Sequence, residues 1–239
     1  MHFLLLQIRN GDDPMRHHEV TCFGRAIGCP PERISVFDLL SGAPAPSVLT
    51  ACDVVLLGGS GHYSAAGEGE WLERTLDVLR GIHALGLPTF ASCWGFQAMA
   101  RAMGGVVRHD PSLAELGTIT LRLTACGEQD PLFGPLGPTF KGQAGHEDSV
   151  IELPPGAIRL ASSDRVENQA YRFSDRPIYC TQFHPELRRA DLLARLQAYP
   201  EYVRNLSGLP LEEFAQRCEE TPEAATLLPR FVALLRDAH

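Results

Sequence analysis

Short apolar runs alternate with amphipathic segments along the first hundred residues of the chain. Four of these runs predict buried strands, at residues 2–8, 33–38, 53–57 and 88–91. Between them, apolar residues recur at intervals of three and four and predict helices at 15–28 and 70–85. The proline-containing segment 44–47 predicts a loop. Such alternation of strand and helix is typical of a mostly parallel sheet with helices on both faces.

The second half of the chain has a different pattern. Strand-like runs with short connections predict a meander added to the sheet, at residues 117–124, 139–142, 158–161, 166–173 and 177–183. Four helical segments separated by prolines follow, at residues 190–198, 201–205, 211–219 and 223–237. We therefore expect a main domain over 1–190 and a helical extension over 191–239 that packs on it. The alternative is that the apolar stripes of the extension dock a partner.

Charge and composition exclude several classes of protein. The 239 residues carry a formal net charge of −8, which argues against nucleic-acid binding because that function needs a basic face. No apolar run approaches the ~20 residues that span a bilayer, and the N-terminal FLLLQI is too short for a signal peptide. The seven cysteines form no CxxC pair and no zinc-ligand spacing. We therefore expect a cytoplasmic protein with reduced thiols, no membrane contact and no metal.

One cysteine occupies a distinctive position. The apolar run that ends at Ala91 is followed almost at once by a run of helix-forming residues at 96–103, so Cys93 lies in a sharp strand-to-helix turn. Ala91 and Gly95 flank Cys93 at two residues on either side, the spacing of a nucleophile elbow, in which small neighbours let a strained turn expose the reactive atom. A helix N-terminus also favours the reactive thiolate. The alternative is that Cys93 is an ordinary buried hydrophobe.

Two further segments end strands at the same expected edge of the sheet. The strand at 53–57 runs into a glycine cluster, Gly58–Gly61, which permits close approach of a ligand, although taken alone a tight turn is the better explanation. The last strand ends in the sequence His184-Pro185-Glu186. Because ligands bind beyond the carboxyl ends of parallel strands, we expect both segments to lie near Cys93.

His184 and Glu186 have the chemistry that a reactive thiol requires. Side chains two residues apart on an extended segment point the same way. The Glu186 carboxylate can therefore bond one imidazole nitrogen of His184 while the other nitrogen faces the thiol, which is the logic of a catalytic triad. The alternative is a structural histidine, with Glu186 capping the next helix. His146, in the polar loop GQAGHEDSV, is a further candidate to line the site.

Together these segments resemble the class I glutamine amidotransferases. FASCWGFQAMARAMGG is similar to the family's Cys-x-Gly-x-Gln motif, CTQFHPEL to its Gln-Phe-His-Pro-Glu motif, and LLGGSG to its glycine turn. QAGHEDSV is similar to the His-x-Asp-x-Val loop of the GMP-synthetase-like subgroup. The resemblance covers about residues 50–190. It implies a flavodoxin-like fold with a catalytic triad of Cys93, His184 and Glu186.

The resemblance also implies a reaction. Cys93 attacks the side-chain amide of glutamine or of a γ-glutamyl compound, and water hydrolyses the resulting thioester to release glutamate and ammonia or an amine. No cofactor is needed for these steps. Six further positions are implied to contact the substrate or to hold its oxyanion, with the amides of Gly59 and Trp94 in the second role: Gly58, Gly59, Ser60, Trp94, Gln97 and His146.

Several departures from the family pattern leave the substrate open. Ser60 stands where the family often has proline, Trp94 and Phe96 are bulky, and Glu147 stands where many members have glycine or asparagine. No synthetase segment follows the triad motif. The protein is therefore expected to be a free-standing γ-glutamyl hydrolase. The alternatives are an ammonia-producing subunit of a separate synthetase, which makes a synthetase the expected partner, or a non-catalytic binding protein. Homo-oligomers also remain open.

Overall fold

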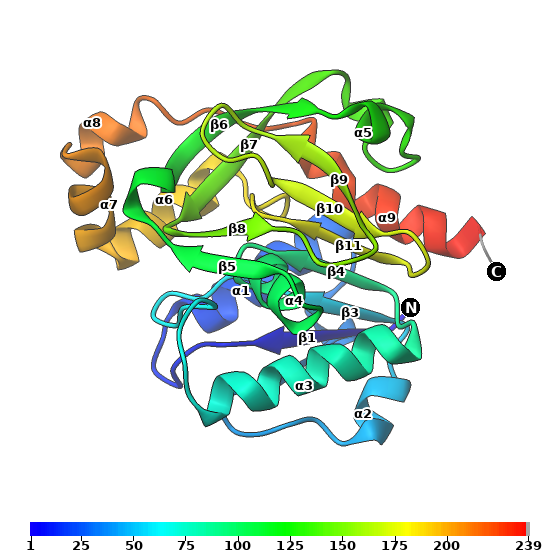
Figure 1. The fold of residues 1–239 in the computed structure, drawn as a ribbon. Coiled ribbons are helices and arrows are strands. Elements are labelled where there is room, and N and C mark those ends of the chain that lie inside the picture. The colour runs from blue at the N-terminus through cyan, green and yellow to red at the C-terminus, as the bar shows by residue number, and fades with distance from the viewer. Residues whose placement is uncertain (238–239) are drawn as a thin grey trace.

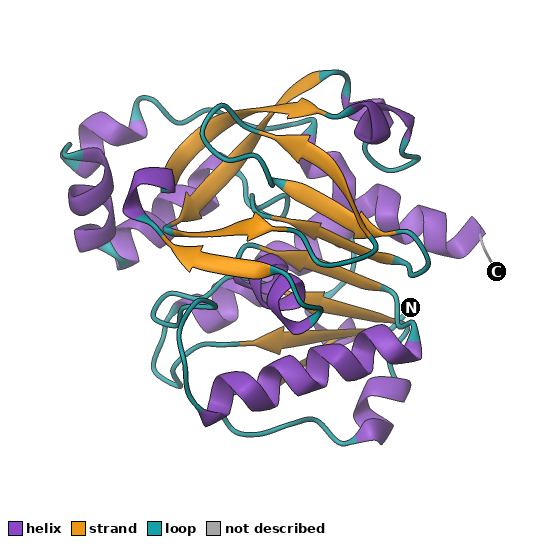
Figure 2. Ribbon diagram, in the orientation of Figure 1, coloured by secondary structure: helices purple, strands orange, loops and turns teal. Residues whose placement is uncertain are grey.

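The computed structural model describes residues 1–237, which form a nine-stranded sheet with helices on both faces (Figures 1 and 2). Five neighbouring strands are parallel, in the order β2 (Ile34–Asp38), β1 (Phe3–Gln7), β3 (Val54–Leu57), β4 (Thr89–Ser92) and β11 (Ile178–Thr181). The sheet continues antiparallel through β10 (Ala170–Phe173), β9 (Ala157–Ser162), β6 (Glu115–Leu123) and β7 (Thr139–His146). The predicted parallel sheet and added meander are thereby confirmed.

The helices of the first half lie close to their expected positions, as α1 (Met15–Ile27), α3 (Glu70–Leu85) and α4 (Trp94–Ala102). The loop expected at 44–47 is partly wrong, because α2 spans Pro46–Thr50. Its proline occupies the first helical position, where the missing N–H costs nothing. Four short 3-10 helices connect other elements, at Pro31–Arg33, Pro111–Leu113, Gly134–Leu136 and Ala224–Thr226.

Three short elements have no counterpart in the sequence pattern. Strands β5 (Val106–His109) and β8 (Asp148–Glu152) pair in a separate two-stranded sheet, and α5 (Ala125–Gln129) follows β6. β5 has no buried residue, so it lacks the apolar alternation that marks a strand. The strand expected at 166–173 is also shorter, since β10 begins at Ala170.

The C-terminal helices are α6 (Arg189–Ala198), α7 (Pro200–Ser207), α8 (Leu211–Ala215) and α9 (Leu227–Asp237). The predicted segments 211–219 and 223–237 are longer than α8 and α9, and residues 238 and 239 lie outside the described part. The division of the chain at residue 190 stays a prediction. None of the described helices combines the length and apolar character needed to cross a bilayer.

Alternate strand residues point to opposite faces of the sheet and contribute to two apolar cores, one on each face. Leu4 and Leu6 of β1 join helices α3 and α4 in one core, whereas Phe3 and Leu5 join α1 and α9 in the other. Phe231 of α9 packs edge to face on Phe90 of β4, with ring centroids 5.5 Å apart. Both layers therefore fix the carboxyl edge of β3, β4 and β11, where the predicted site residues lie.

Candidate active site

Cys93 lies in the turn between β4 and α4 with φ of 54° and ψ of −107°. Within residues 1–237 it is the one non-glycine residue with a positive φ, and such strain persists only where the surroundings enforce it. The Cys93 N–H donates to the Thr181 carbonyl oxygen at 2.8 Å, which ties the turn to β11. The side chain is 7% exposed and lines a pocket. The predicted strand-to-helix turn is thus present at Cys93.

Steric constraints explain the small residues on either side of Cys93. A Cβ atom on Gly95 would lie 2.5 Å from the Cβ of Leu57 and 3.3 Å from the Cβ of Ala91. The first of these distances is far inside van der Waals contact, so only glycine fits there without a shift of β3. The Gly95 N–H donates to the Gly58 carbonyl oxygen at 3.1 Å, which joins the elbow to the glycine cluster.

His184 and Glu186 follow β11, and His184 lines the same pocket as Cys93. The His184 Nδ1–H donates to Glu186 Oε1 at 2.7 Å, and both side chains are buried. The His184 N–H donates to the Gln143 carbonyl oxygen at 2.8 Å, so β7 fixes the position of the ring. The Cys93 thiol donates to the Gly145 carbonyl oxygen at 3.7 Å, and it lines the same pocket as the imidazole, close enough to raise the pKa of His184. The structure therefore brings the three predicted triad residues to one place, and their catalytic roles stay a prediction.

The charges of the triad shift the pKa values of two of its members. Burial alone lowers the pKa of His184, but the Glu186 carboxylate and the Cys93 thiol outweigh burial and raise it above 6.5. Burial alone raises the pKa of Glu186, but His184 and then Arg195 lower it below 4.5. Glu186 therefore stays ionised at neutral pH, and the imidazole holds a proton more tightly than a free histidine does.

A pocket of about 260 Å³ opens above the thiol and the imidazole. Five of the six predicted contact residues line this pocket, namely Gly59, Ser60, Trp94, Gln97 and His146. Gly58 lies behind it and contributes its carbonyl oxygen to the elbow. A pocket with apolar walls and a few convergent polar groups is the usual form of a small-molecule site.

The amide of Gly59 already has a partner in this structure. Its N–H donates to Oε1 of Glu19, a fully buried carboxylate, at 3.1 Å. Glu19 also accepts from Arg9 at 3.2 Å and from Gln7 at 2.9 Å. The role of Gly59 in holding an oxyanion stays a prediction, and that role requires the bond to Glu19 to open.

The side chains of Gln97 and His146 are held by neighbouring polypeptide. Gln97 Nε2 donates to the Asp148 carbonyl oxygen at 2.8 Å and to Gln182 Oε1 at 3.1 Å. The ring nitrogens of His146 lie 3.0 Å from the Asp148 carbonyl oxygen and 3.1 Å from Glu115 Oε2. His146 is the last residue of β7 rather than part of a loop. Both side chains line the pocket, and their contact with substrate stays a prediction.

Several site residues escaped the sequence analysis because their contacts span large distances along the chain. Arg195 of α6 lies 3.4 Å from His184 Nδ1 and 3.7 Å from Glu186 Oε1. Its guanidinium also lies 3.9 Å from Glu19. Arg9 donates to the hydroxyl of Tyr199, between α6 and α7, at 3.2 Å. The only signal in the sequence was the placement of Arg195 on a predicted helix soon after the triad motif.

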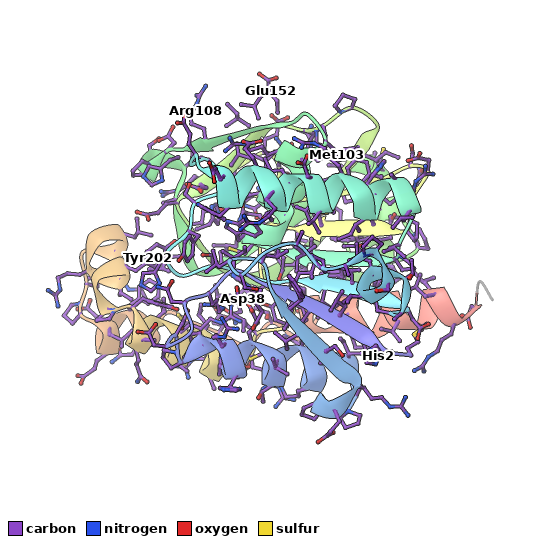
Figure 3. All side chains as sticks on the ribbon, turned by 90° about the horizontal axis from the view of Figure 1, so that it is seen from below. His2, Asp38, Met103, Arg108, Glu152 and Tyr202 are labelled. Carbon is purple, nitrogen blue, oxygen red and sulfur yellow. The ribbon has the colours of Figure 1, made fainter. Side chains whose placement is uncertain are left out.

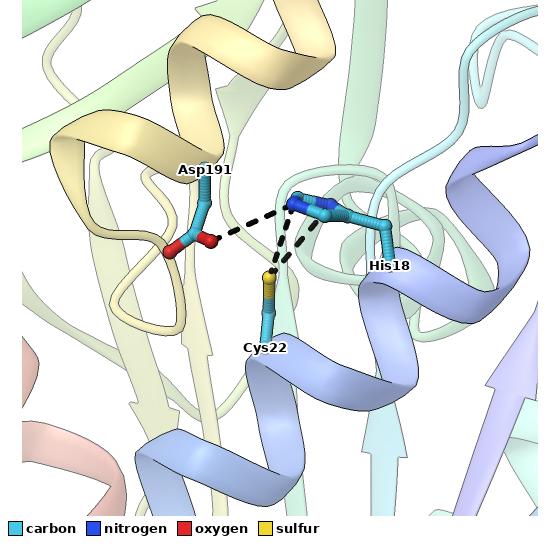
Figure 4. Close-up of side chains that lie close together, drawn as sticks. All are labelled: His18, Cys22 and Asp191. Atoms are coloured by element: carbon cyan, nitrogen blue, oxygen red, sulfur yellow. Dashed lines mark hydrogen bonds and ion pairs between the residues drawn. The ribbon is translucent and has the colours of Figure 1, made fainter.

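A second cluster of polar side chains joins α1 to α6 (Figure 4). His18 and Cys22 of α1 face Asp191 of α6, with ligand-type atoms within 4.8 Å of one another. Asp191 also pairs with the Arg25 guanidinium, and burial raises the pKa of the Cys22 thiol to about 12. A metal ion would need a thiolate and an unpaired carboxylate as ligands, and this cluster offers neither. Its contacts instead hold α6 against α1.

The fold and site define the class of protein: an α/β protein with a cysteine elbow and a histidine–carboxylate pair at the carboxyl edge of its sheet. The family model of glutamine amidotransferase class-I matches residues 39–192. The chain therefore belongs to the class-I glutamine amidotransferases and is an enzyme of the amidotransferase type, which confirms the resemblance seen in the sequence.

Curated relatives include two proteins that are named as subunits of a glutamine-hydrolyzing GMP synthase. The one from Sulfolobus acidocaldarius is 32% identical over 139 residues, covering 58% of this chain and 70% of the relative. The one from Methanothermobacter thermautotrophicus is 35% identical over 121 residues, covering 51% of this chain and 63% of the relative. A glutamine-hydrolyzing GMP synthase from Leifsonia xyli subsp. xyli is 32% identical over 176 residues, covering 70% of this chain and 33% of the relative. The aligned part thus spans from one third to about two thirds of these relatives.

Solved structures share the fold at low sequence identity. A glutamine amidotransferase from Thermotoga maritima superimposes with a TM-score of 0.78 at 18% identity, covering 98% of this chain and 97% of that one. A glutamine amido transferase from Methylobacillus flagellatus gives a TM-score of 0.72 at 20% identity, covering 97% and 94%. The fold predicted from the sequence is thereby confirmed.

Proposed function

We propose that this protein hydrolyses the γ-glutamyl amide bond of glutamine or of a γ-glutamyl compound through a thioester on Cys93. The observation that carries the proposal is the convergence of three groups: a thiol on a strained turn, an imidazole, and a carboxylate 2.7 Å from that imidazole. Family membership supports the same chemistry. The products are glutamate and ammonia or an amine.

The reaction follows from the protonation states of the triad. The Cys93 thiolate attacks the amide carbonyl carbon, and the Nε2–H of His184 protonates the nitrogen as the C–N bond breaks. Water then transfers a proton to His184 and attacks the thioester carbon, and the C–S bond breaks to release glutamate. Glu186 holds the ring in position and stabilises the imidazolium in both steps.

The oxyanion of each tetrahedral intermediate needs hydrogen-bond donors. The N–H of Trp94 opens helix α4 and is one of the amides that have no carbonyl partner within the helix. The N–H of Gly59 is the second donor once Glu19 releases it. In other enzymes the loss of one such donor lowers kcat by about a hundredfold or more.

The nucleophile assignment is tested by replacing Cys93. We expect Cys93→Ala to lower glutamate release from L-glutamine and from γ-glutamyl-p-nitroanilide by at least about 10³-fold, because no other group supplies the thioester. Mass spectrometry should detect an acyl-enzyme on the wild type and none on the variant. Cys126→Ala removes an exposed thiol and serves as the matched control, with wild-type rates expected. A fully active Cys93→Ala enzyme contradicts the proposal.

A second candidate function draws on the names of the relatives, two of which are subunits of a GMP synthase. In this case the protein supplies ammonia to a separate synthetase chain. The experiment is to measure glutamine hydrolysis with and without an ATP-pyrophosphatase chain from the same organism. Stimulation of about tenfold or more supports the ammonia-supplying function, whereas an unchanged rate supports the free-standing hydrolase. Failure of a glutamine-analogue affinity label to react with Cys93 instead indicates a binding protein.

A further inference from the structure

One wall of the pocket is built by the C-terminal helices rather than by the sheet. Five side chains of this wall come from α6, α7 and the residue between them, namely Leu192, Arg195, Leu196, Tyr199 and Tyr202. Four of the five lie beyond the end of the family match at residue 192. Most of this wall therefore lies outside the segment that matches the family model.

The orientation of the His184 ring indicates on which side of the pocket the leaving amine lies relative to the wall. Because His184 Nδ1 is bonded to Glu186, the leaving amine must receive its proton from Nε2, on the pocket side of the ring. We place the glutamyl part at the side of the pocket lined by Gln97 and His146, the residues to which the family resemblance assigns it. The substituent on the leaving nitrogen consequently faces the space between the glycine cluster and the helical wall.

The two tyrosines of the wall contact different parts of the protein. The Tyr199 ring packs edge to face on His62, just after the glycine cluster, with centroids 5.6 Å apart. Tyr202, labelled on α7 in Figure 3, lies beside Gly145, at the end of β7, and is close enough to Cys93 for the thiol to affect its pKa. Burial raises the pKa of Tyr202 well above 10, so its hydroxyl stays neutral.

The wall offers apolar surface and little unpaired charge. The Tyr199 hydroxyl donates to Asp13 at 2.8 Å and accepts from Arg9, so the ring is the part left for a ligand. The Arg195 cation is balanced by carboxylates of Glu186 and Glu19 within 4 Å. Leu192 and Leu196 of α6 complete the surface. Glu147 and Asp148 also line the pocket, at the end of β7 and the start of β8. Against the wall itself, a charged substituent would lose hydration without gaining a partner among Leu192, Leu196 and the tyrosine rings.

We propose that α6 and α7 form a leaving-group subsite for an uncharged apolar amine, so that the preferred substrates are γ-glutamyl amides of apolar amines rather than free glutamine. This inference rests on the proposed γ-glutamyl hydrolysis and specifies its substrate class. Ammonia, the leaving group of glutamine, is too small to contact the wall. An alkyl or aryl group on the leaving nitrogen covers Leu196 and both tyrosines.

The experiment compares amides that differ only at the far end of the leaving amine. The probes are L-glutamine, γ-glutamyl-butylamide, the monoamide of 1,4-diaminobutane and the amide of 4-aminobutanoate; the last three share one chain length and differ in terminal charge. We expect the wild-type kcat/KM for the butylamide to exceed that for each of the other three by at least about tenfold, the usual range for filling an apolar subsite.

Two substitutions in the wall then locate the preference. Tyr202→Ala and Leu196→Ala should each lower the ratio of butylamide to glutamine kcat/KM by about tenfold, because each removes surface that only the butyl group contacts. Tyr202→Phe keeps the ring and should retain the ratio, which separates a subsite role from a folding defect. Glu213→Ala, at an exposed position of α8, is the matched control in the same extension and should retain the ratio.

The outcomes separate this inference from the proposed function. Equal or better hydrolysis of glutamine, or preference for either charged amide, overturns the apolar subsite while leaving the hydrolase intact. A ratio that Tyr202→Ala and Leu196→Ala leave unchanged overturns the placement of the subsite. Absence of Cys93-dependent glutamate release from all four probes overturns the proposed function itself.

Discussion

A chain of buried charges links the triad to residues far away in sequence. Glu186 contacts both His184 and Arg195, Arg195 reaches Glu19, and Glu19 pairs with Arg9. Removing one member of a buried ion pair leaves an uncompensated charge at a cost of about 3–5 kcal/mol. These residues are therefore mutually dependent, and the positions of His184 and Gly59 depend on all of them.

The pH dependence of activity tests the role of Glu186. Glu186→Gln removes the carboxylate that raises the pKa of His184, so burial then dominates and the pKa falls. Loss of the imidazolium sets the alkaline limb of the kcat/KM profile, and this limb should move to lower pH as kcat/KM falls by at least about tenfold. The measurement is kcat/KM for glutamine across the range from acid to alkaline pH.

Glu152→Gln is the control for this experiment, because Glu152, labelled in Figure 3, is an exposed carboxylate that does not line the pocket. The alkaline limb of the kcat/KM profile of Glu152→Gln should coincide with that of the wild type. An alkaline limb of Glu186→Gln that stays at the wild-type pH contradicts the assignment of Glu186 as the group that raises the His184 pKa.

Residue-scale prediction from sequence identified candidates where the pattern is local. Cys93 was found from its two small neighbours, and Glu186 from its spacing to His184. Arg195 and Glu19 could not be found in this way, because their contacts join α1, α6 and the glycine cluster across distant parts of the chain. The apolar wall around Tyr202 could not be predicted either. An apolar stripe on a helix indicates that the helix packs on something, but it does not identify the surface on which it packs.

At the scale of elements, the elbow between β4 and α4 is the most constrained feature. The positive φ of Cys93 is fixed by the bond from its N–H to β11 and by the contact of Gly95 with β3. Sequence pattern located this turn correctly because both flanking elements have strong signals. It did not predict β5 and β8, which are short strands that pair away from the main sheet.

Two glycine substitutions test the constraint at the elbow. Gly95→Ala places a methyl group 2.5 Å from the Leu57 Cβ and should destabilise the protein by about 1–3 kcal/mol. Gly81→Ala in α3 meets nothing within 4 Å and should stabilise it by about 0.5–1 kcal/mol, the usual gain for alanine over glycine in a helix. Urea unfolding measures both, and a neutral or stabilising Gly95→Ala contradicts the tight contact.

At the scale of the whole molecule, the sheet is covered by helices from both ends of the described chain. Helix α1 and helix α9 share one core, while α3 and α4 complete the other. The sequence predicted the two-faced architecture through the alternation of strand and helix. It did not predict that α9 packs on the central strands, because an apolar stripe does not specify its partner.

Buried thiols in both layers make stability depend on alkaline pH. Burial raises the pKa of Cys22 and of Cys180 from 9.0 to about 12. Between these values the folded state holds protons that the unfolded state releases, so the free energy of unfolding falls as pH rises through this range. Each thiol contributes a slope of about 1.4 kcal/mol per pH unit. Urea unfolding at a series of pH values on either side of 9.0 should show this loss.

Cys180→Ala should make this slope shallower, and Cys126→Ala, which removes an exposed thiol, should leave it as in the wild type. A free energy of unfolding that stays constant across the same series of pH values rules out these two thiols as its source.

The order of the site residues along the chain has a consequence for the newly made protein. Cys93 leaves the ribosome about ninety residues before His184, an interval of roughly 5–20 s at ordinary rates of synthesis. Tyr199 and Tyr202 follow later still. A nascent chain therefore carries its sulfur for several seconds without the imidazole beside it, so the site is complete only when synthesis is nearly finished.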